Sequence, residues 1–77
     1  MFWRDKKNGY AVNAYRIDIE GKDGFELYVV SAKEPTLAVE AGLKRYQTEH
    51  GKGAARKCKL YTLAGELLIE KFLRDYS

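Results

Sequence analysis

The sequence is poor in the residues that usually build disulfides, metal centres and thiol chemistry. Its 77 residues include one cysteine, Cys58, and one histidine, His50. A single cysteine cannot form an internal disulfide, and one cysteine with one histidine falls short of the ligand set of a typical zinc site. No apolar run approaches the roughly 20 residues of a membrane span, and no signal-peptide pattern follows Met1. These features predict a cytoplasmic protein with no cofactor, no metal and no membrane contact.

Catalytic motifs are also lacking. His50 and Cys58 lie eight residues apart, but a Cys–His pair needs a shared cleft and a third group that orients the histidine. Gly51, Lys52 and Gly53 form a glycine-rich turn without the Lys-Ser/Thr ending of a phosphate-binding loop. The sequence therefore predicts that the protein is not an enzyme.

Length and charge favour one small domain over residues 1–77 with a locally basic surface. The formal net charge is +3. Residues 44–59 carry six basic side chains and one acidic side chain, while the rest of the chain has eight basic and ten acidic ones. The positive charge is therefore concentrated in one segment, as it is in proteins that bind anionic partners.

The most regular stretch is residues 35–50. Apolar and small residues recur there at helical spacing: Ala38, Val39, Gly42, Leu43, Tyr46 and His50. Pro35 suits the first helical position, and Gly51 suits the cap after the last turn. Gly42 costs about 1 kcal/mol relative to alanine inside a helix. Its place beside the apolar stripe therefore predicts a close approach between the helix and a sheet.

Two strands are predicted before this helix. Residues 10–20 and 25–31 alternate in hydrophobicity, and the glycine-rich segment between them predicts a hairpin turn. A three-residue loop 21–23 beside Gly24 would place both apolar sets under the helix. Those sets are Tyr15, Ile17, Ile19, Phe25, Leu27 and Val29.

A third strand is predicted over residues 56–63, with Cys58 and Leu60 facing inward. Residues 66–76 fit a terminal amphipathic helix by periodicity. They also fit a fourth strand after a loop 63–65 in which Gly65 is left-handed, and this hairpin is the favoured interpretation. It would place Leu60 opposite Leu68 and Tyr61 opposite Leu67. The predicted fold is α+β: an antiparallel sheet of three to four strands with one helix on one face, in the order β-β-α-β-β, or β-β-α-β-α if the terminal element is a helix.

The sheet face turned away from that helix is the candidate binding surface. It is predicted to carry Tyr10, Val12, Arg16, Tyr28, Val30, Lys59 and Tyr61. If residues 66–76 form the fourth strand, Leu67 and Ile69 join them. Exposed tyrosine and arginine are typical of protein interfaces. The alternative is that Phe2, Trp3 and the C-terminal tail cover this face.

These features predict a small non-enzymatic binding protein that docks on a larger protein or ribonucleoprotein. The predicted contact residues are Tyr10, Arg16, Tyr28, Tyr61, Lys52, Arg56, Lys57 and Lys59. The alternative is a single-stranded nucleic-acid binder, with bases stacked on Tyr28 and Tyr61 and basic side chains on the phosphates. An unpaired sheet edge would also allow a homodimer.

Three segments carry a resemblance to a class of small proteins: residues 15–19 (YRIDI), 34–41 (EPTLAVEA) and 59–67 (KLYTLAGEL). Their order, within residues 10–73, resembles that of small phage and mobile-element proteins of β-β-α-β-β type, some of which are anti-CRISPR inhibitors. The resemblance implies a phage-type inhibitor acting in the host cytoplasm. Because this chain is basic and such inhibitors are often acidic mimics of nucleic acid, it implies contact with an acidic protein patch or a guide RNA.

Overall fold

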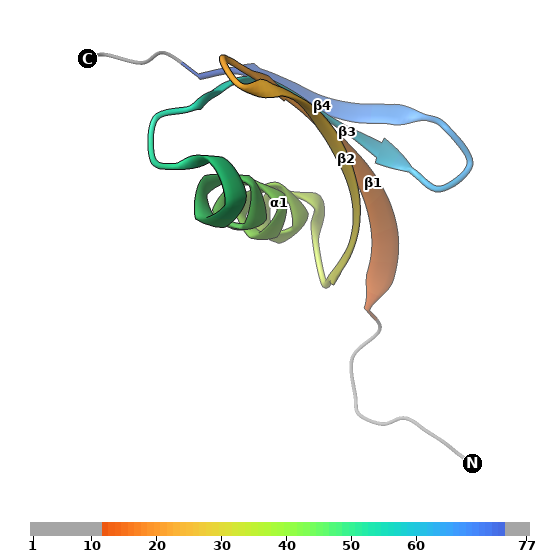
Figure 1. The fold of residues 1–77 in the computed structure, drawn as a ribbon. Helices are drawn as coiled ribbons and strands as arrows, with labels where there is room; N and C mark the ends of the chain where they lie inside the picture. Colours follow the sequence, from red (N-terminus) through yellow and green to blue (C-terminus); the bar gives the residue numbers. More distant parts are fainter. Residues whose placement is uncertain (1–11, 74–77) are drawn as a thin grey trace.

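A four-stranded antiparallel sheet with a single helix on one face forms the described part of the protein (Figure 1). The computed structural model describes residues 12–73. The elements are β1 (Asn13–Gly21), β2 (Gly24–Ala32), α1 (Pro35–His50), β3 (Ala55–Thr62) and β4 (Leu67–Phe72). The α+β class and the order β-β-α-β-β are confirmed.

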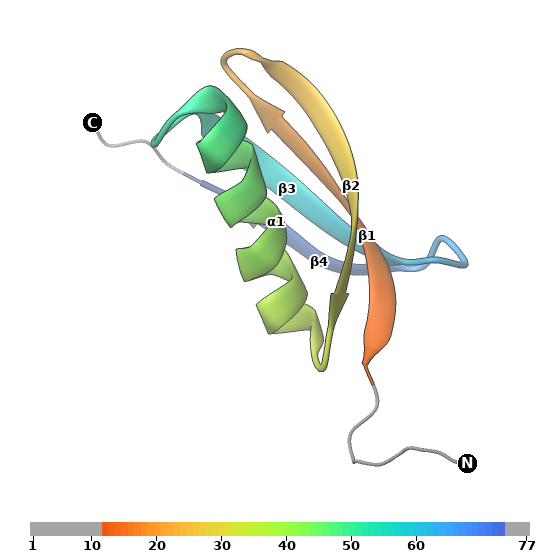
Figure 2. The same cartoon turned by 60° about the horizontal axis from the view of Figure 1, so that its bottom comes forward.

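The strand order across the sheet is β2-β1-β3-β4, so β1 and β3 are central and β2 and β4 are the edges. Helix α1 connects edge strand β2 to central strand β3 and lies across the sheet (Figure 2). The C-terminal element is a strand, which confirms the hairpin interpretation over the helical one.

The core lies between α1 and the sheet. Helix residues Ala38, Val39, Gly42 and Tyr46 are buried, as the helical stripe predicts. The sheet contributes side chains that alternate along the central strands: Tyr15, Ile17, Ile19, Cys58 and Leu60. Burial of such side chains removes apolar surface from water and is the main stabilising term of the fold.

Gly42 allows the helix to approach the sheet closely. A Cβ atom at this position would lie 2.6 Å from Cγ2 of Ile17, which is closer than van der Waals contact permits. The close approach predicted from the glycine in the helical stripe is therefore confirmed.

Gly21 has a similar role at the end of the first hairpin. A Cβ atom there would collide with the hydroxyl of Tyr46 and the carbonyl oxygen of Ala54. Tyr46 is fully buried, and its hydroxyl donates a hydrogen bond to the carbonyl oxygen of Gly24 over 2.9 Å. The amide of Lys22 donates to the carbonyl oxygen of Ala54 over 3.0 Å. These contacts join the hairpin, the helix and the segment before β3.

The predicted register of the first hairpin is wrong by one residue. Gly21 pairs with Gly24, which leaves a two-residue loop of Lys22 and Asp23 in place of the three-residue loop. Ile17 therefore lies opposite Tyr28. The helix side of β2 carries Glu26, Tyr28, Val30 and Ala32, and the other side carries Phe25, Leu27 and Val29.

Alternation could not settle this register, because β2 has large apolar side chains on both of its faces. Tyr28 suits the helix side of an edge strand, since its ring is buried while its hydroxyl reaches a polar partner at the rim.

The second hairpin agrees with its prediction more closely. Tyr61 pairs with Leu67 as predicted, and Gly65 has a positive φ of 101°. Leu60 pairs with Ile69 instead of Leu68, because an irregularity between Leu60 and Tyr61 inserts an extra residue in β4. Ile69 consequently packs against the core and is not on the outer side as predicted.

Candidate interaction surface

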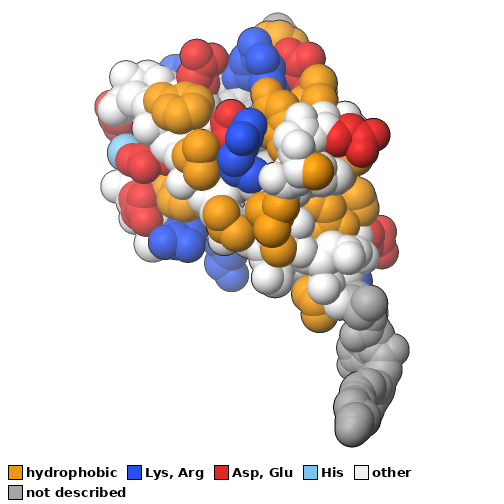
Figure 3. All heavy atoms as spheres, turned by 90° about the vertical axis from the view of Figure 1, so that its right-hand side faces the viewer, with side chains coloured by type: hydrophobic (Ala, Val, Ile, Leu, Met, Phe, Trp, Pro, Cys, Tyr) orange, Lys and Arg blue, Asp and Glu red, His pale blue; other side chains and the backbone are white. Residues whose placement is uncertain are grey.

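The face of the sheet turned away from α1, the outer sheet face, is the largest candidate site in the described residues. Four strands contribute three positions each in matched rows. These are Arg16, Asp18 and Glu20 from β1, Phe25, Leu27 and Val29 from β2, Lys57, Lys59 and Tyr61 from β3, and Leu67, Glu70 and Phe72 from β4. Figure 3 shows this face, with hydrophobic side chains interleaved with charged ones.

The two edge strands carry the apolar part of the outer sheet face. Phe25 is 58 % exposed, Val29 57 % and Phe72 68 %, and Leu27 and Leu67 are about half exposed. Isolated exposed apolar side chains are normal on a protein surface, but here they line both margins of one face of the sheet. Such a group of side chains is typical of an interface.

Five of the six charged side chains of the outer sheet face lie on the two central strands and the sixth, Glu70, lies on β4, and these charges cancel. Three basic side chains lie among three acidic ones: Arg16, Lys57, Lys59, Asp18, Glu20 and Glu70. Arg16 forms an ion pair with Asp18, with 3.2 Å between Nε and Oδ1. Lys57 forms a second pair with Glu70, with 3.6 Å between Nζ and Oε2. The face therefore presents apolar margins around a neutral polar centre.

Cations also lie against aromatic rings on this face. The guanidinium of Arg16 is 4.2 Å from the ring centroid of Tyr61, and Nζ of Lys57 is 5.0 Å from that of Phe72. Both distances fall within the range of a cation–π interaction. A hollow of about 140 Å³ lies beside them, lined by Asp18, Glu20, Phe25, Lys57, Lys59 and Tyr61.

The structure places four of the predicted contact residues on the outer sheet face: Arg16, Lys57, Lys59 and Tyr61. Lys52 is exposed in the turn between α1 and β3. Arg56 is partly buried, and its Nη1 donates to the carbonyl oxygen of Gly53 over 2.6 Å. Tyr10 and the covering role considered for Phe2 and Trp3 lie outside the described residues.

The predicted outward placement of Tyr28 is wrong. Tyr28 is 6 % exposed and packs on the helix side of β2. Its hydroxyl donates to Oε1 of Glu49 over 2.7 Å, and the guanidinium of Arg45 lies 4.8 Å from its ring centroid. Burial raises the pKa of Tyr28 to about 12, with the hydrogen bond to Glu49 acting in the same direction. A ring held in this way offers no surface on which a base could stack.

The locally basic segment also does not form one patch. Lys57 and Lys59 lie on the outer sheet face, whereas Arg45 lies on the helix, above the opposite face, and contacts Glu49 and Tyr28. Its Nε is 3.7 Å from Oε2 of Glu49. The positive charge seen in the sequence is therefore divided between the two sides of the sheet.

Sequence reasoning missed Phe25, Leu27, Val29 and Phe72 as members of the outer sheet face. A signal for the first three is present: glycines at positions 21 and 24 flank two residues that suit a two-residue hairpin loop. A two-residue loop between the first two strands, read from these glycines, places the three side chains on the outer sheet face.

The single cysteine and the single histidine are in separate environments. Cys58 is 1 % exposed, and burial raises the pKa of its thiol, which disfavours the thiolate that a nucleophile needs. The inward placement of Cys58 predicted from the sequence is therefore confirmed. His50 lies in the last turn of α1, and its Nε2 is 3.0 Å from Oε2 of Glu26.

No protein-family profile, curated protein or solved structure matches this chain. Across residues 12–73, no helix has the length and apolar character needed to cross a membrane. The candidate site therefore rests on the geometry of the chain itself.

Proposed function

We propose that this chain is a non-enzymatic binding module that docks on a larger protein through the outer sheet face. The observation that carries the proposal is the pair of exposed apolar margins on edge strands β2 and β4. These side chains add little to the core, which lies on the other side of the sheet. Covering them with a partner would remove apolar surface from water.

The balance of charge on the outer sheet face favours a protein partner over a nucleic acid. Affinity for nucleic acid depends on basic side chains that replace counterions on phosphates. Here three acidic side chains offset three basic ones, and Arg16 and Lys57 are already ion-paired. Binding of a single strand remains the alternative prediction, with the exposed rings of Phe25 and Phe72 and the half-buried ring of Tyr61 as the surfaces on which bases could stack.

The inhibitor role implied by the resemblance to phage proteins remains a prediction about the partner and adds no residue to the site. The sheet-edge homodimer is also a prediction, for which β2 and β4 are the available edges.

The proposal is tested by affinity capture from a lysate of the native host, with the full chain as bait. The double variant Phe25→Ser, Phe72→Ser should lose the captured protein while its thermal unfolding stays close to wild type. Leu63→Ser is the matched control, because Leu63 is 63 % exposed but lies in the turn between β3 and β4. It should capture the same protein as wild type.

Two further measurements separate the alternatives. Fluorescence anisotropy with labelled oligo(dT) and oligo(U) at low and moderate salt should show no binding by wild type. Binding that falls steeply with salt and disappears in Tyr61→Ala would replace the protein-partner proposal with the nucleic-acid one. Analytical ultracentrifugation that detects a wild-type dimer dissociated by Phe25→Ser, Phe72→Ser would identify the partner as a second copy.

A further inference from the structure

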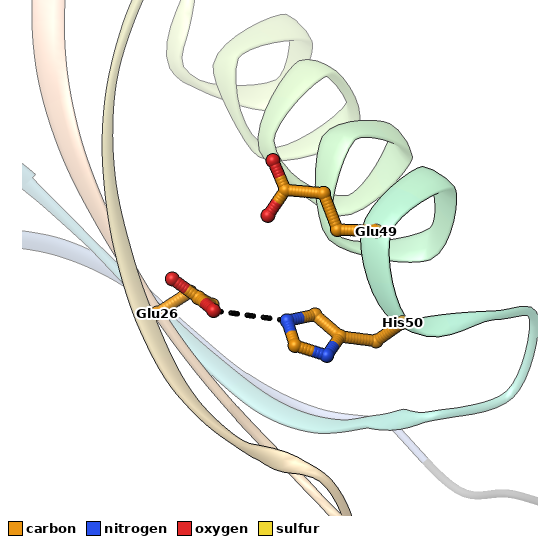
Figure 4. Close-up of side chains that lie close together, drawn as sticks. All are labelled: Glu26, Glu49 and His50. Atoms are coloured by element: carbon orange, nitrogen blue, oxygen red, sulfur yellow. Dashed lines mark hydrogen bonds and ion pairs between the residues drawn. The ribbon is translucent and has the colours of Figure 1, made fainter.

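Three side chains with metal-binding groups converge on the helix side of the sheet, away from the outer sheet face. Glu49 and His50 are the last two residues of α1, and Glu26 lies on the neighbouring edge strand β2. Figure 4 shows the three side chains directed toward one another from these two elements. One ligand atom from each residue lies within 4.8 Å of the others. Nε2 of His50 and Oε2 of Glu26 are 3.0 Å apart.

Buried neighbours fix the positions of two of these side chains. The hydroxyl of Tyr28 donates to Oε1 of Glu49, and Tyr28 itself is buried. The ring of His50 lies on the ring of Tyr46, with 4.3 Å between centroids and a tilt of 31°. Partners that orient ligand side chains in this way are a regular part of metal sites, where they raise affinity.

The chemistry of the group suits a borderline dication such as Zn²⁺. An imidazole nitrogen with carboxylate oxygens is a donor set of zinc, whereas Ca²⁺ and Mg²⁺ prefer oxygen ligands alone. Two carboxylates would balance the charge of the ion. Glu26 is 39 % exposed and Glu49 44 % exposed, so water can reach the group and fill a fourth position.

The required movement is small. Metal–ligand distances of about 2.0–2.2 Å in a tetrahedral site place ligand atoms roughly 3.5 Å apart. The pair of Glu26 and His50 already lies near that spacing. An adjustment of Glu49 that keeps the hydrogen bond from Tyr28 to Oε1 and moves Oε2 away from Arg45, now 3.7 Å from it, would complete the set.

We propose that Glu26, Glu49 and His50 form a binding site for a single Zn²⁺-type ion that links β2 to the C-terminal end of α1. The competing account is an ion pair between protonated His50 and Glu26 in which Glu49 takes no part. This metal site is independent of the docking function proposed for the outer sheet face, so either proposal can fail without affecting the other.

The test is isothermal titration of the full chain with ZnCl₂ after treatment with a chelator, together with the visible absorption of the Co²⁺ form. We expect one equivalent of Zn²⁺ to bind and d–d bands to appear with Co²⁺. At a free Zn²⁺ concentration of 100 times the Kd, binding to the folded state alone should raise the melting temperature by roughly 11–22 °C. His50→Ala and Glu26→Gln should abolish saturable binding. Glu49→Gln, which replaces one carboxylate oxygen by an amide nitrogen and leaves the fold intact, should weaken it at least tenfold.

Tyr28→Phe distinguishes a built site from scattered surface ligands. It keeps the buried ring but removes the hydroxyl that orients Glu49, and the loss of such a partner weakens metal binding about 10- to 100-fold. The matched control is Glu40→Gln, an exposed glutamate on the same helix, which should bind like wild type.

Three results would overturn the proposal. The first is the absence of one-equivalent binding by wild type. The second is binding that survives in both Glu26→Gln and Glu49→Gln, which would assign the ion to other groups. The third is loss of binding in Cys58→Ala with retention in His50→Ala, which would assign it to the thiol.

Discussion

Both faces of the sheet carry large apolar side chains, but the two sets differ in their exposure to water. On the helix side, Ile17, Ile19 and Leu60 are fully buried beneath α1. On the outer sheet face, Phe25, Val29 and Phe72 are more than half exposed. Hydrophobicity therefore stabilises the fold on the helix side, and on the outer sheet face the proposed function would use it as contact area for a partner. Measurements that separate stability from binding can test this division.

The largest difference is expected between core and outer truncations. Ile17→Ala should lower the free energy of unfolding by about 2–5 kcal/mol, because it removes a fully buried side chain and leaves a cavity. Leu27→Ala on the outer sheet face should change it by less than about 1 kcal/mol. Urea unfolding followed by circular dichroism gives both values. Equal losses would mean that the outer sheet face is part of the core.

The second largest effect is expected at alkaline pH. Ionisation of Tyr28, on the helix side of the sheet, should lower the free energy of unfolding. The pKa of Tyr28 is raised to about 12 from an ordinary value of 10.0. The folded state holds this proton more tightly than the unfolded state, so the stabilisation is complete below pH 10 and is lost as the pH rises toward 12. At 1.36 kcal/mol per pH unit, the loss is about 2–3 kcal/mol.

Denaturant unfolding at several pH values between 9 and 12 measures this loss. Tyr28→Phe should have a shallower pH dependence than wild type. Some dependence should remain, because burial also raises the pKa of Tyr46. An unchanged slope in Tyr28→Phe would show that its hydroxyl is not held as the structure describes.

A smaller effect concerns the fit between the helix and its face of the sheet. Gly42→Ala should destabilise the protein by about 1–3 kcal/mol, because the new methyl group collides with Ile17 and this outweighs the gain in helix propensity. The double variant Ile17→Ala, Gly42→Ala should lose less than the sum of the single changes, since the methyl group enters the vacated space. Additive losses would contradict this close contact.

The smallest effect belongs to the outer sheet face. The contact between Arg16 and Tyr61 is a cation–π pair near the surface and should contribute about 0.5–1 kcal/mol. A double-mutant cycle of Arg16→Met and Tyr61→Leu isolates this coupling from the ion pair that Arg16 makes with Asp18. A coupling energy near zero would mean that the two side chains move independently in solution.

Much of the fold follows from local sequence patterns. The apolar stripe on residues 35–50 predicts the helix, and the alternation before it predicts two strands. The glycine at position 65 favours the turn that precedes the last strand. The register of β2 does not follow, because both of its faces carry large apolar groups. Deciding between the faces requires the length of the turn, for which Gly21 and Gly24 are the local signal, and the hydrogen bond from Tyr46 to the carbonyl oxygen of Gly24 then ties this turn to the helix.

The two candidate sites also differ in how far the sequence predicts them: the outer sheet face follows in part from local alternation, and the group of Glu26, Glu49 and His50 does not. Arg16, Lys57, Lys59 and Tyr61 were placed correctly because they alternate with buried residues on central strands. Glu26 and His50 are 24 residues apart in sequence and come together only when α1 lies along β2. No pattern of spacing in a single sequence predicts such a pair.

The crowding around Gly21 has a consequence for how the molecule opens. The hydroxyl of Tyr46 and the carbonyl oxygen of Ala54 occupy the space beside this glycine, and Tyr46 also holds Gly24. The first two strands cannot separate from the helix at this end without also releasing the connection that follows it. Amide hydrogens in these three segments should therefore become open to deuterium exchange in a single concerted event, with one common free energy of opening.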